Sequence, residues 1–228
     1  MKKVFVLVAA LLVCFVVTAQ ENRVVKNTSS SLYFNIGPSF PMSDFASNNA
    51  GEPNAGYAKT GFNLNLNYDY MFEKYVGITF NGLYGTHKMD QKIIKDWNDG
   101  VDIPGADVSH YQYVGLLAGP VLTGTLSPDA NINFKLLGGV ARSRSPQATY
   151  QGVIYFKQDW TTSFAWRLNT DFRYTIANNI FLMVDLSYTQ MRPDFTIIIN
   201  PNETNPETLH REVHVNTLNL NAGVGIKF

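Results

Sequence analysis

The chain has 228 residues, and its 18 Lys and Arg balance its 18 Asp and Glu, so the formal net charge is zero. The absence of a basic excess argues against nucleic-acid binding. Only 16% of the residues are charged, whereas 13% are aromatic, and few charges with many aromatic side chains suit a surface in contact with lipid.

Residues 1–19 have the three parts of a secretory signal peptide: a basic start, an apolar run over residues 4–17 and a small-residue cleavage site ending at Ala19. The run is shorter than the roughly 20 apolar residues that span a bilayer as a helix. Cys14, the only cysteine, raises the alternative of a lipoprotein anchor, but Val13 stands where a small residue normally precedes the modified cysteine. Because cleavage after Ala19 removes Cys14, we expect neither a disulfide nor a cysteine-based metal site in the mature protein.

The strongest structural signal is residues 61–72 (GFNLNLNYDYMF), in which apolar or aromatic side chains alternate with Asn and Asp. Alternation with a period of two predicts a strand with one apolar and one polar face. Soluble sandwich strands also alternate, so the class is decided by the recurrence of this pattern behind the leader. After a polar tail over residues 20–30, the sequence predicts eight strands: 31–41, 61–72, 75–86, 110–125, 131–142, 163–174, 180–190 and 214–228.

The strand at residues 110–125 is the least regular of the eight. Its GLLAGP segment leaves open which of its faces points outward. Pro120 has no N–H group to donate, and it therefore predicts a bulge or a local break in the pairing of this strand.

The connections between the strands alternate in length. Those at 73–74, 127–130 and 176–179 are short, and those at 42–60, 87–109, 143–162 and 191–213 are long. Barrels of the bacterial outer membrane have short periplasmic turns and longer outer loops, and eight strands with both ends in the periplasm need three turns and four loops. The sequence therefore predicts an all-β, eight-stranded antiparallel up-and-down transmembrane β-barrel over residues 31–228, located in the cell outer membrane.

Two of the long loops carry structural signals of their own. The loop at 87–109 has the composition to form a short helix, and the strands flanking 143–162 are candidates to continue beyond the membrane as a hairpin. The main structural alternative to the whole prediction is a soluble lipocalin-like barrel, which would turn its apolar face inward and its asparagines into water.

The charged residues within the strands all fall on the polar face. They are Asp69, Lys135, Arg167, Asp171, Arg173, Asp185 and Lys227. A charge on the lipid face would cost about 2–4 kcal/mol near the midplane of the membrane. Arg142 and Arg192 do fall on the lipid face, but only at strand ends, where the outer headgroup region would hold them. We expect the first six to form an internal network of ion pairs and hydrogen bonds that fills a narrow barrel. The alternative is a narrow channel with a continuous water path past Arg167 and Asp171.

Aromatic residues are expected to form a girdle at each edge of the barrel. The periplasmic girdle would contain Tyr68, Tyr70, Phe72, Phe172, Tyr174 and Phe228, and the outer girdle Phe40, Tyr84, Phe164, Trp166 and Tyr188.

The four histidines, His87, His110, His210 and His214, fall at the ends of the outer loops, where ordinary rim histidines are expected. Their spacing matches no metal-ligand pattern. An enzyme acting on lipid or peptide at the outer rim would need a histidine within hydrogen-bond reach of Ser, Asp or Glu in a cleft. Ser109 with His110, or His210 and His214 with Asp194, are the residues that this alternative would use. We predict no catalytic, cofactor-binding or metal-binding residue.

Three segments carry a family resemblance. The leader ending in Ala19-Gln20, residues 37–45 (GPSFPMSDF) and the terminal Gly225 to Phe228 resemble small outer-membrane β-barrel proteins of the Bacteroidetes, the PorT-like group. In architecture the chain also resembles the OmpX and OmpA transmembrane barrels. The resemblance implies residence in the outer membrane and offers no catalytic residues. It also implies that the terminal aromatic residue, Phe228, is the assembly signal that the barrel-assembly machinery recognises.

These observations predict a non-enzymatic protein with a structural or surface-interaction role through its four long outer loops. The expected partners are outer-membrane lipid and lipopolysaccharide, the barrel-assembly machinery and an unidentified extracellular partner, with no nucleic acid and no cofactor.

Overall fold

The computed structural model describes residues 29–49, 52, 54–97, 105–151, 153–157, 159–199 and 207–228. The predicted signal peptide over residues 1–19 lies outside the described residues. The predicted polar tail does so up to residue 28, whereas Ser29 and Ser30 already belong to the first strand. Within the described part of the chain, no helix combines the length and the apolar character needed to cross a membrane.

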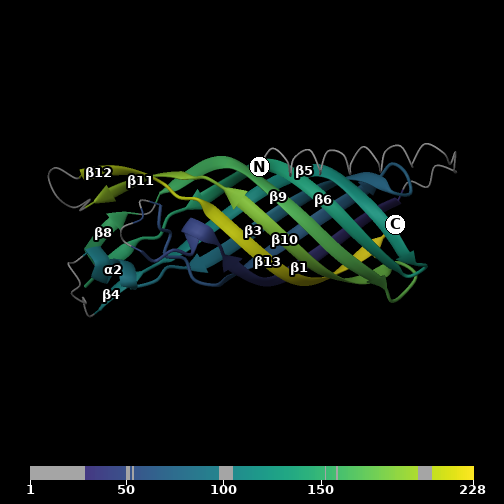
Figure 1. Ribbon diagram of the computed structural model, residues 1–228, viewed down its shortest axis with the longest axis horizontal. Helices are drawn as coiled ribbons and strands as arrows, with labels where there is room; N and C mark the ends of the chain where they lie inside the picture. The colour runs from purple at the N-terminus through teal and green to yellow at the C-terminus, as the bar shows by residue number, and fades with distance from the viewer. Residues whose placement is uncertain are drawn as a thin grey trace.

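Eight strands form a closed barrel in the order β1-β13-β10-β9-β6-β5-β3-β2 (Figure 1). Their bounds are β1 (Ser29–Pro41), β2 (Gly61–Met71), β3 (Val76–Lys88), β5 (His110–Ser127), β6 (Ala130–Arg144), β9 (Trp160–Thr175), β10 (Ile180–Met191) and β13 (Val215–Lys227). Each strand pairs antiparallel with its neighbours along the chain, and the seam between β1 and β13 closes the ring. The predicted eight-stranded up-and-down barrel is therefore confirmed.

The barrel turns its apolar side chains outward and its polar side chains inward. On β2, for example, Leu66 is 53% exposed, whereas its neighbour Asn65 is only 1% exposed. The aromatic residues at both edges also point outward, so the outer surface is a continuous apolar band. Such a surface needs apolar surroundings, and the soluble lipocalin-like alternative, which requires the opposite facing, is wrong.

The structure settles the facing of β5. Tyr111, Tyr113, Leu117 and Val121 point into the barrel, and Leu116 points outward. The pairing of β5 with β6 is interrupted after Ala118 and resumes at Val121 in the same register, so the predicted irregularity at Pro120 is a local break rather than a bulge.

One glycine in the barrel wall leaves room for a large inward-pointing ring. The ring of Tyr113 lies directly over Gly85 on β3, and a Cβ at Gly85 would overlap the ring atoms. This arrangement allows Tyr113 to lie flat against the wall near one end of the lumen.

The end of the barrel that carries the long loops is called the outer end below. Beyond it, five short strands form a second sheet in the order β12-β11-β8-β7-β4, which we call the outer sheet (Figure 1). Its strands are β4 (Ala106–Val108), β7 (Ala148–Tyr150), β8 (Val153–Lys157), β11 (Asp194–Ile199) and β12 (Glu207–Glu212). They come from the predicted loops at 87–109, 143–162 and 191–213, so three of the four long loops build one structure.

The other two elements at this end are short helical turns. The expected helix in the loop at 87–109 is present as α2 (Lys92–Trp97), and the loop at 42–60 begins with a 3-10 turn, η2 (Ser43–Phe45). The hairpin expected at 143–162 is formed by β7 and β8. Its pairing with β11 was not predicted, because it joins segments that are far apart in the sequence, such as Lys157 and Ile198.

Candidate functional site

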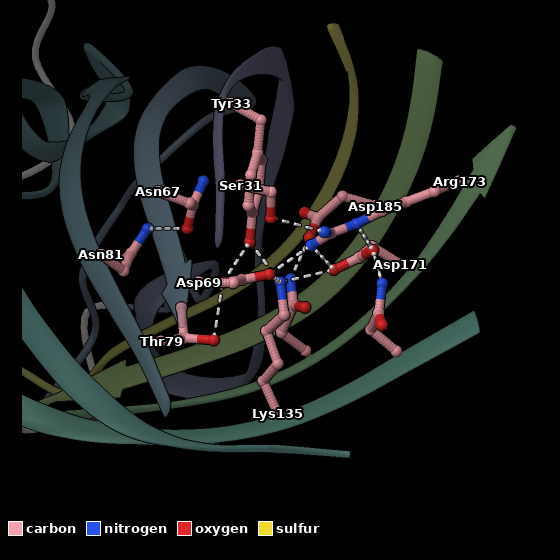
Figure 2. Close-up of polar contacts among 12 residues, drawn as sticks. Ser31, Tyr33, Asn67, Asp69, Thr79, Asn81, Lys135, Asp171, Arg173 and Asp185 are labelled. Atoms are coloured by element: carbon pink, nitrogen blue, oxygen red, sulfur yellow. Dashed lines mark hydrogen bonds and ion pairs between the residues drawn. The ribbon is translucent and has the colours of Figure 1, made fainter. Parts of the chain in front are cut away.

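Four of the six predicted interior charges meet in one cluster near the short-turn end of the barrel (Figure 2). Lys135 Nζ lies 2.6 Å from Asp171 Oδ2 and 3.4 Å from Asp69 Oδ2. Arg173 Nη2 lies 2.6 Å from Asp69 Oδ2, and Arg173 Nε lies 2.7 Å from Asp171 Oδ1. Two cations therefore bridge two carboxylates, and the charge cluster formed by these four side chains is neutral as a whole.

Neighbouring side chains satisfy the remaining hydrogen-bonding capacity of the two carboxylates. Asp69 Oδ1 accepts a hydrogen bond from Tyr33 Oη at 3.1 Å and another from Thr79 Oγ1 at 2.8 Å (Figure 2). Asp171 Oδ1 accepts one from Asn133 Nδ2 at 2.6 Å. Because a buried charge is stable only when it is paired and hydrogen-bonded, these donors explain how two carboxylates persist inside the barrel.

The ring of Tyr33 lies against both cations of the cluster. The Arg173 guanidinium carbon is 4.4 Å from the centre of the ring, and Lys135 Nζ is 4.7 Å from it. Lys135 also donates a hydrogen bond to Tyr33 Oη. Tyr33 was not among the predicted site residues, although its place on the polar face of the 31–41 strand was a signal that could have found it.

The other two predicted charges form a separate pair. Arg167 Nη2 lies 3.5 Å from Asp185 Oδ1 and donates to Ser187 Oγ at 2.6 Å. Arg167 also donates to Asn65, and Asp185 accepts from Asn221 Nδ2 at 2.7 Å. The structure thus divides the predicted network into two groups, each made of oppositely charged partners with buried amides and hydroxyls around them.

Above these polar layers, apolar side chains close the outer end of the lumen. Phe45, from η2, is fully buried, and its ring meets those of His87 and Tyr111 edge-on at centroid distances of 5.1 and 5.2 Å. The cluster around it, called the apolar plug below, contains Ala58, Leu83, Tyr113, Leu117, Leu137, Ala141, Ala165, Met191, Phe195, Val213 and Val215. The plug has no clear signal in the sequence, because Phe45 is an isolated aromatic residue in a polar loop.

His87 differs from the rim histidine that was expected. It points into the barrel and is fully buried, with its ring stacked on that of Tyr113 at a centroid distance of 6.0 Å. Its Nδ1 lies 3.0 Å from the carbonyl oxygen of Lys59, which can only accept, and its Nε2 lies 3.1 Å from Ser39 Oγ. His87 lies three residues beyond Tyr84, the last aromatic residue of the lipid-facing band on β3, and burial lowers its pKa from 6.5 to about 4.

The depressed pKa of His87 predicts that the outer end loses stability in mild acid. Below pH 6.5 the unfolded chain binds a proton at this ring, whereas the folded chain does not bind it until about pH 4. The free energy of unfolding should therefore be highest above pH 6.5 and fall by about 3 kcal/mol between pH 6.5 and 4. Denaturant unfolding of the protein in lipid vesicles at several pH values measures this loss. His87→Gln should flatten the profile, whereas an unchanged profile in that variant would show that another group causes the loss.

His214 links the turn η2 to the start of β13. Its Nδ1 lies 2.8 Å from Asp44 Oδ2 and its Nε2 lies 2.9 Å from Glu212 Oε1. The two carboxylates lie at opposite ring nitrogens, so they do not converge on one point that a metal ion could occupy. Within the described residues, no group of three or more His, Cys, Asp or Glu side chains is placed to hold a metal ion.

Within the described residues, no hydrogen bond or ion pair joins Ser109 to His110, or Asp194 to His210 or His214; His214 instead contacts Asp44 and Glu212. Ser109 Oγ accepts a hydrogen bond from the backbone of Gln147 at 2.7 Å, and the neighbouring His110 is exposed. His210 lies opposite Thr196 in the outer sheet, while Asp194 lies opposite Glu212.

Phe228 lies at the short-turn end of the seam between β1 and β13. Its N–H donates to the carbonyl of Ser30 at 2.9 Å, and its carbonyl accepts from the Ser30 N–H at 2.8 Å. Its side chain is 63% exposed. A role of this ring as an assembly signal stays a prediction.

Comparison with known proteins agrees with this architecture. The sequence model of the outer membrane protein beta-barrel domain matches residues 7–228. A major outer membrane protein of Thermus thermophilus is similar in structure, with a TM-score of 0.56 at 12% identity over 88% of this chain and 99% of that one. The outer membrane protein OprG of Pseudomonas aeruginosa gives a TM-score of 0.51 at 16% identity over 89% and 97%. At such low sequence identities the structural likeness concerns the fold alone. No curated protein sequence matches this chain.

Proposed function

Because the chain belongs to the outer membrane protein beta-barrel domain family and resides in the outer membrane, we propose that it is a non-enzymatic surface-interaction protein whose outer sheet meets an extracellular partner. The finer resemblance to the PorT-like group of the Bacteroidetes, and the recognition of Phe228 by the barrel-assembly machinery, belong to the same proposal.

The outer sheet is the observation that carries the proposal. β11 and β12 continue the hairpin of β10 and β13, while β7, β8 and β4 continue β6, β9 and β5, so one side of the barrel wall extends beyond the lipid-facing band (Figure 1). Backbone pairing across three loops orders a surface that separate loops would leave mobile. Since binding to a preordered surface avoids the entropic cost of ordering loops, such a sheet is suited to recognition.

The filled interior argues against the channel alternative. A water path would have to pass the apolar plug around Phe45, then the pair of Arg167 and Asp185, and then the charge cluster around Lys135 and Arg173. An eight-stranded barrel has an interior just wide enough for side chains. The rim enzyme has less support, because the ring nitrogens of His214 face two carboxylates rather than a hydroxyl group.

Trimming the outer sheet tests the proposal. Residues 146–158 are replaced by a short Asn-Gly turn, which removes β7 and β8 but keeps the hydrogen bond of 3.0 Å between Ser145 N and the Asp159 carbonyl as the new closing pair. Cells that display the native or the trimmed protein are tested for adhesion to immobilised mucin, fibronectin and laminin. We expect the trimmed barrel to remain folded, as judged by its faster migration on unboiled detergent gels, and to lose adhesion to the surface that the native protein binds.

Two results would contradict the proposal. The first concerns the surfaces to which cells with the native protein adhere better than cells without it. If cells with the trimmed protein adhere equally well to every such surface, the outer sheet is not the binding surface. The second is a steady ion conductance of the native protein in planar bilayers, which would favour the channel alternative.

A further inference from the structure

A cationic patch lies on the outside of the barrel, directly above the lipid-facing band. The outward side chains of β6 run from Val140, which is 57% exposed, to Arg142 and then Arg144. On the neighbouring strand β9 the outward series runs from Phe164, which is 66% exposed, to Thr162 and Trp160. One outward step along a tilted strand is about 5 Å of height, so both arginines lie at the depth of the lipid headgroups.

The ring of Trp160 lies close to both guanidinium groups. The guanidinium carbon of Arg142 is 5.3 Å from the centre of the Trp160 ring, and that of Arg144 is 5.8 Å from it. Arg144 lies directly opposite Trp160 in the pairing of β6 with β9, and its Nη1 donates to Gln112 Oε1 on β5 at 3.2 Å. Contact with an aromatic face and a neighbouring amide restricts both side chains before any ligand arrives.

The surroundings of this arginine pair favour an anion. Thr86 and Lys88 on β3, and His110 and Gln112 on β5, occupy the neighbouring outward positions, and none of them is acidic. Within the described residues, no carboxylate forms an ion pair with Arg142. The acidic residue next to Trp160 is Asp159, whose carboxylate accepts the backbone N–H groups of Trp160 at 2.7 Å and Thr196 at 3.3 Å.

From this geometry we infer that Arg142 and Arg144, with Trp160 beside them, bind the phosphate groups of a phosphorylated glycolipid in the outer leaflet, a lipid of the lipopolysaccharide class. This site is distinct from the outer sheet and depends only on the orientation of the barrel, with its long loops outside. The lipid-binding inference goes beyond the proposed surface-interaction role. Either of these two proposals can be wrong while the other is right.

The chemistry of the three side chains selects this ligand. Each planar guanidinium can donate two parallel hydrogen bonds to one phosphate, so two neighbouring arginines match a headgroup that carries more than one phosphate. The ring of Trp160 is 40% exposed and can pack against the apolar face of a sugar. The apolar side chains of Val140 and Phe164 lie immediately below, where the acyl chains of the same lipid would run.

The test measures lipid binding to the full-length protein in detergent micelles by native mass spectrometry. The probes are bisphosphorylated lipid A, the same lipid A without phosphates, and phosphatidylglycerol. The variant Arg142→Gln/Arg144→Gln should bind bisphosphorylated lipid A about tenfold more weakly than the native protein. The native protein should show a comparable loss when the phosphates are removed from the lipid, and phosphatidylglycerol should bind more weakly than bisphosphorylated lipid A.

Two further variants serve as controls. Arg192→Gln removes one exposed arginine that directly follows β10, two strands from β6 in the barrel order, and should reduce binding much less than the double glutamine variant does. Arg142→Lys/Arg144→Lys keeps both charges without the planar fork and should give intermediate binding. Equal binding of phosphatidylglycerol and lipid A, an equal loss in Arg192→Gln, or no loss in the double glutamine variant would each overturn the inference.

Discussion

Replacing Lys135 by Met is expected to lower the free energy of unfolding by about 3–5 kcal/mol, because removal of one partner from a buried ion pair leaves an uncompensated charge. Lys135 is 3% exposed, and its ammonium group contacts both Asp69 and Asp171. In the variant, two carboxylates share the single cation Arg173, so the charge cluster carries a net negative charge in a position from which water is largely excluded. Equilibrium unfolding in urea, with the barrel refolded into lipid vesicles, measures the change.

Two matched variants separate charge imbalance from loss of packing. Lys135→Met/Asp171→Asn restores neutrality, and we expect it to be more stable than Lys135→Met alone. Lys59→Met breaks the exposed ion pair of 3.2 Å between Lys59 and Asp90, in which the lysine side chain is 58% exposed, and it should cost less than about 1 kcal/mol. Equal effects of Lys135→Met and Lys59→Met would show that the charge cluster does not stabilise the barrel.

Replacing Phe45 by Ala is expected to destabilise the outer end of the barrel by about 3–5 kcal/mol, the usual cost of removing a buried phenylalanine side chain. Phe45 is the centre of the apolar plug, and the backbone around it holds the loop in place through the bonds from Ala58 N to Phe45 O and from Gly56 N to Asp44 O, at 2.9 and 2.8 Å. Hydrogen exchange at the amides of Gly56 and Ala58 should become faster, while exchange in the middle of β2 should be unchanged.

The same variant should remain non-conducting in planar bilayers. The pair of Arg167 and Asp185 and the charge cluster still fill the lumen below the plug. Phe45→Leu, which keeps most of the apolar volume, should show a smaller increase in exchange. A steady conductance in Phe45→Ala would mean that the plug alone closes the barrel and that the polar layers do not.

Local alternation explains why the barrel itself was predictable from the sequence. In a strand, the parity of a residue decides its face, so the inward position of Asp69, Lys135 or Arg167 needs no knowledge of the neighbouring strands. The loop lengths then place both ends of the chain on one side. These two signals are enough for the number of strands and for their order.

The division of the interior charges into two groups could not be predicted from the alternation of residues along each strand. Asp171 and Asp185 lie directly opposite each other on β9 and β10 and both point into the barrel, an arrangement of like charges that is repulsive on its own. Asp171 instead bonds to Lys135 and Arg173, whereas Asp185 bonds to Arg167. Which cation each carboxylate reaches depends on the stagger between strands and on contacts across the lumen.

The outer end was the least predictable region for the same reason. His87 is inward because β3 extends two residues beyond its predicted end, and the plug forms because Phe45 folds back over the lumen from a loop. The outer sheet depends on pairs between loops, such as Ile198 with Lys157. None of these contacts leaves a periodic trace in the sequence.

The seam between β1 and β13 has a consequence for how the protein reaches its folded state. Its pairs, from Ser31 with Lys227 to Pro41 with Thr217, join the two ends of the barrel domain, whereas every other strand of the wall pairs only with close neighbours in sequence. Hairpins can form early because they close short loops, but the ring can close only after the whole domain is available. Until then β1 and β13 each present an unpaired edge, and the polar lumen stays open to the membrane. Closure of this one seam is therefore the step at which a set of hairpins becomes a barrel, and the slow phase of refolding should follow changes in β1 and β13 more closely than changes in the central hairpins.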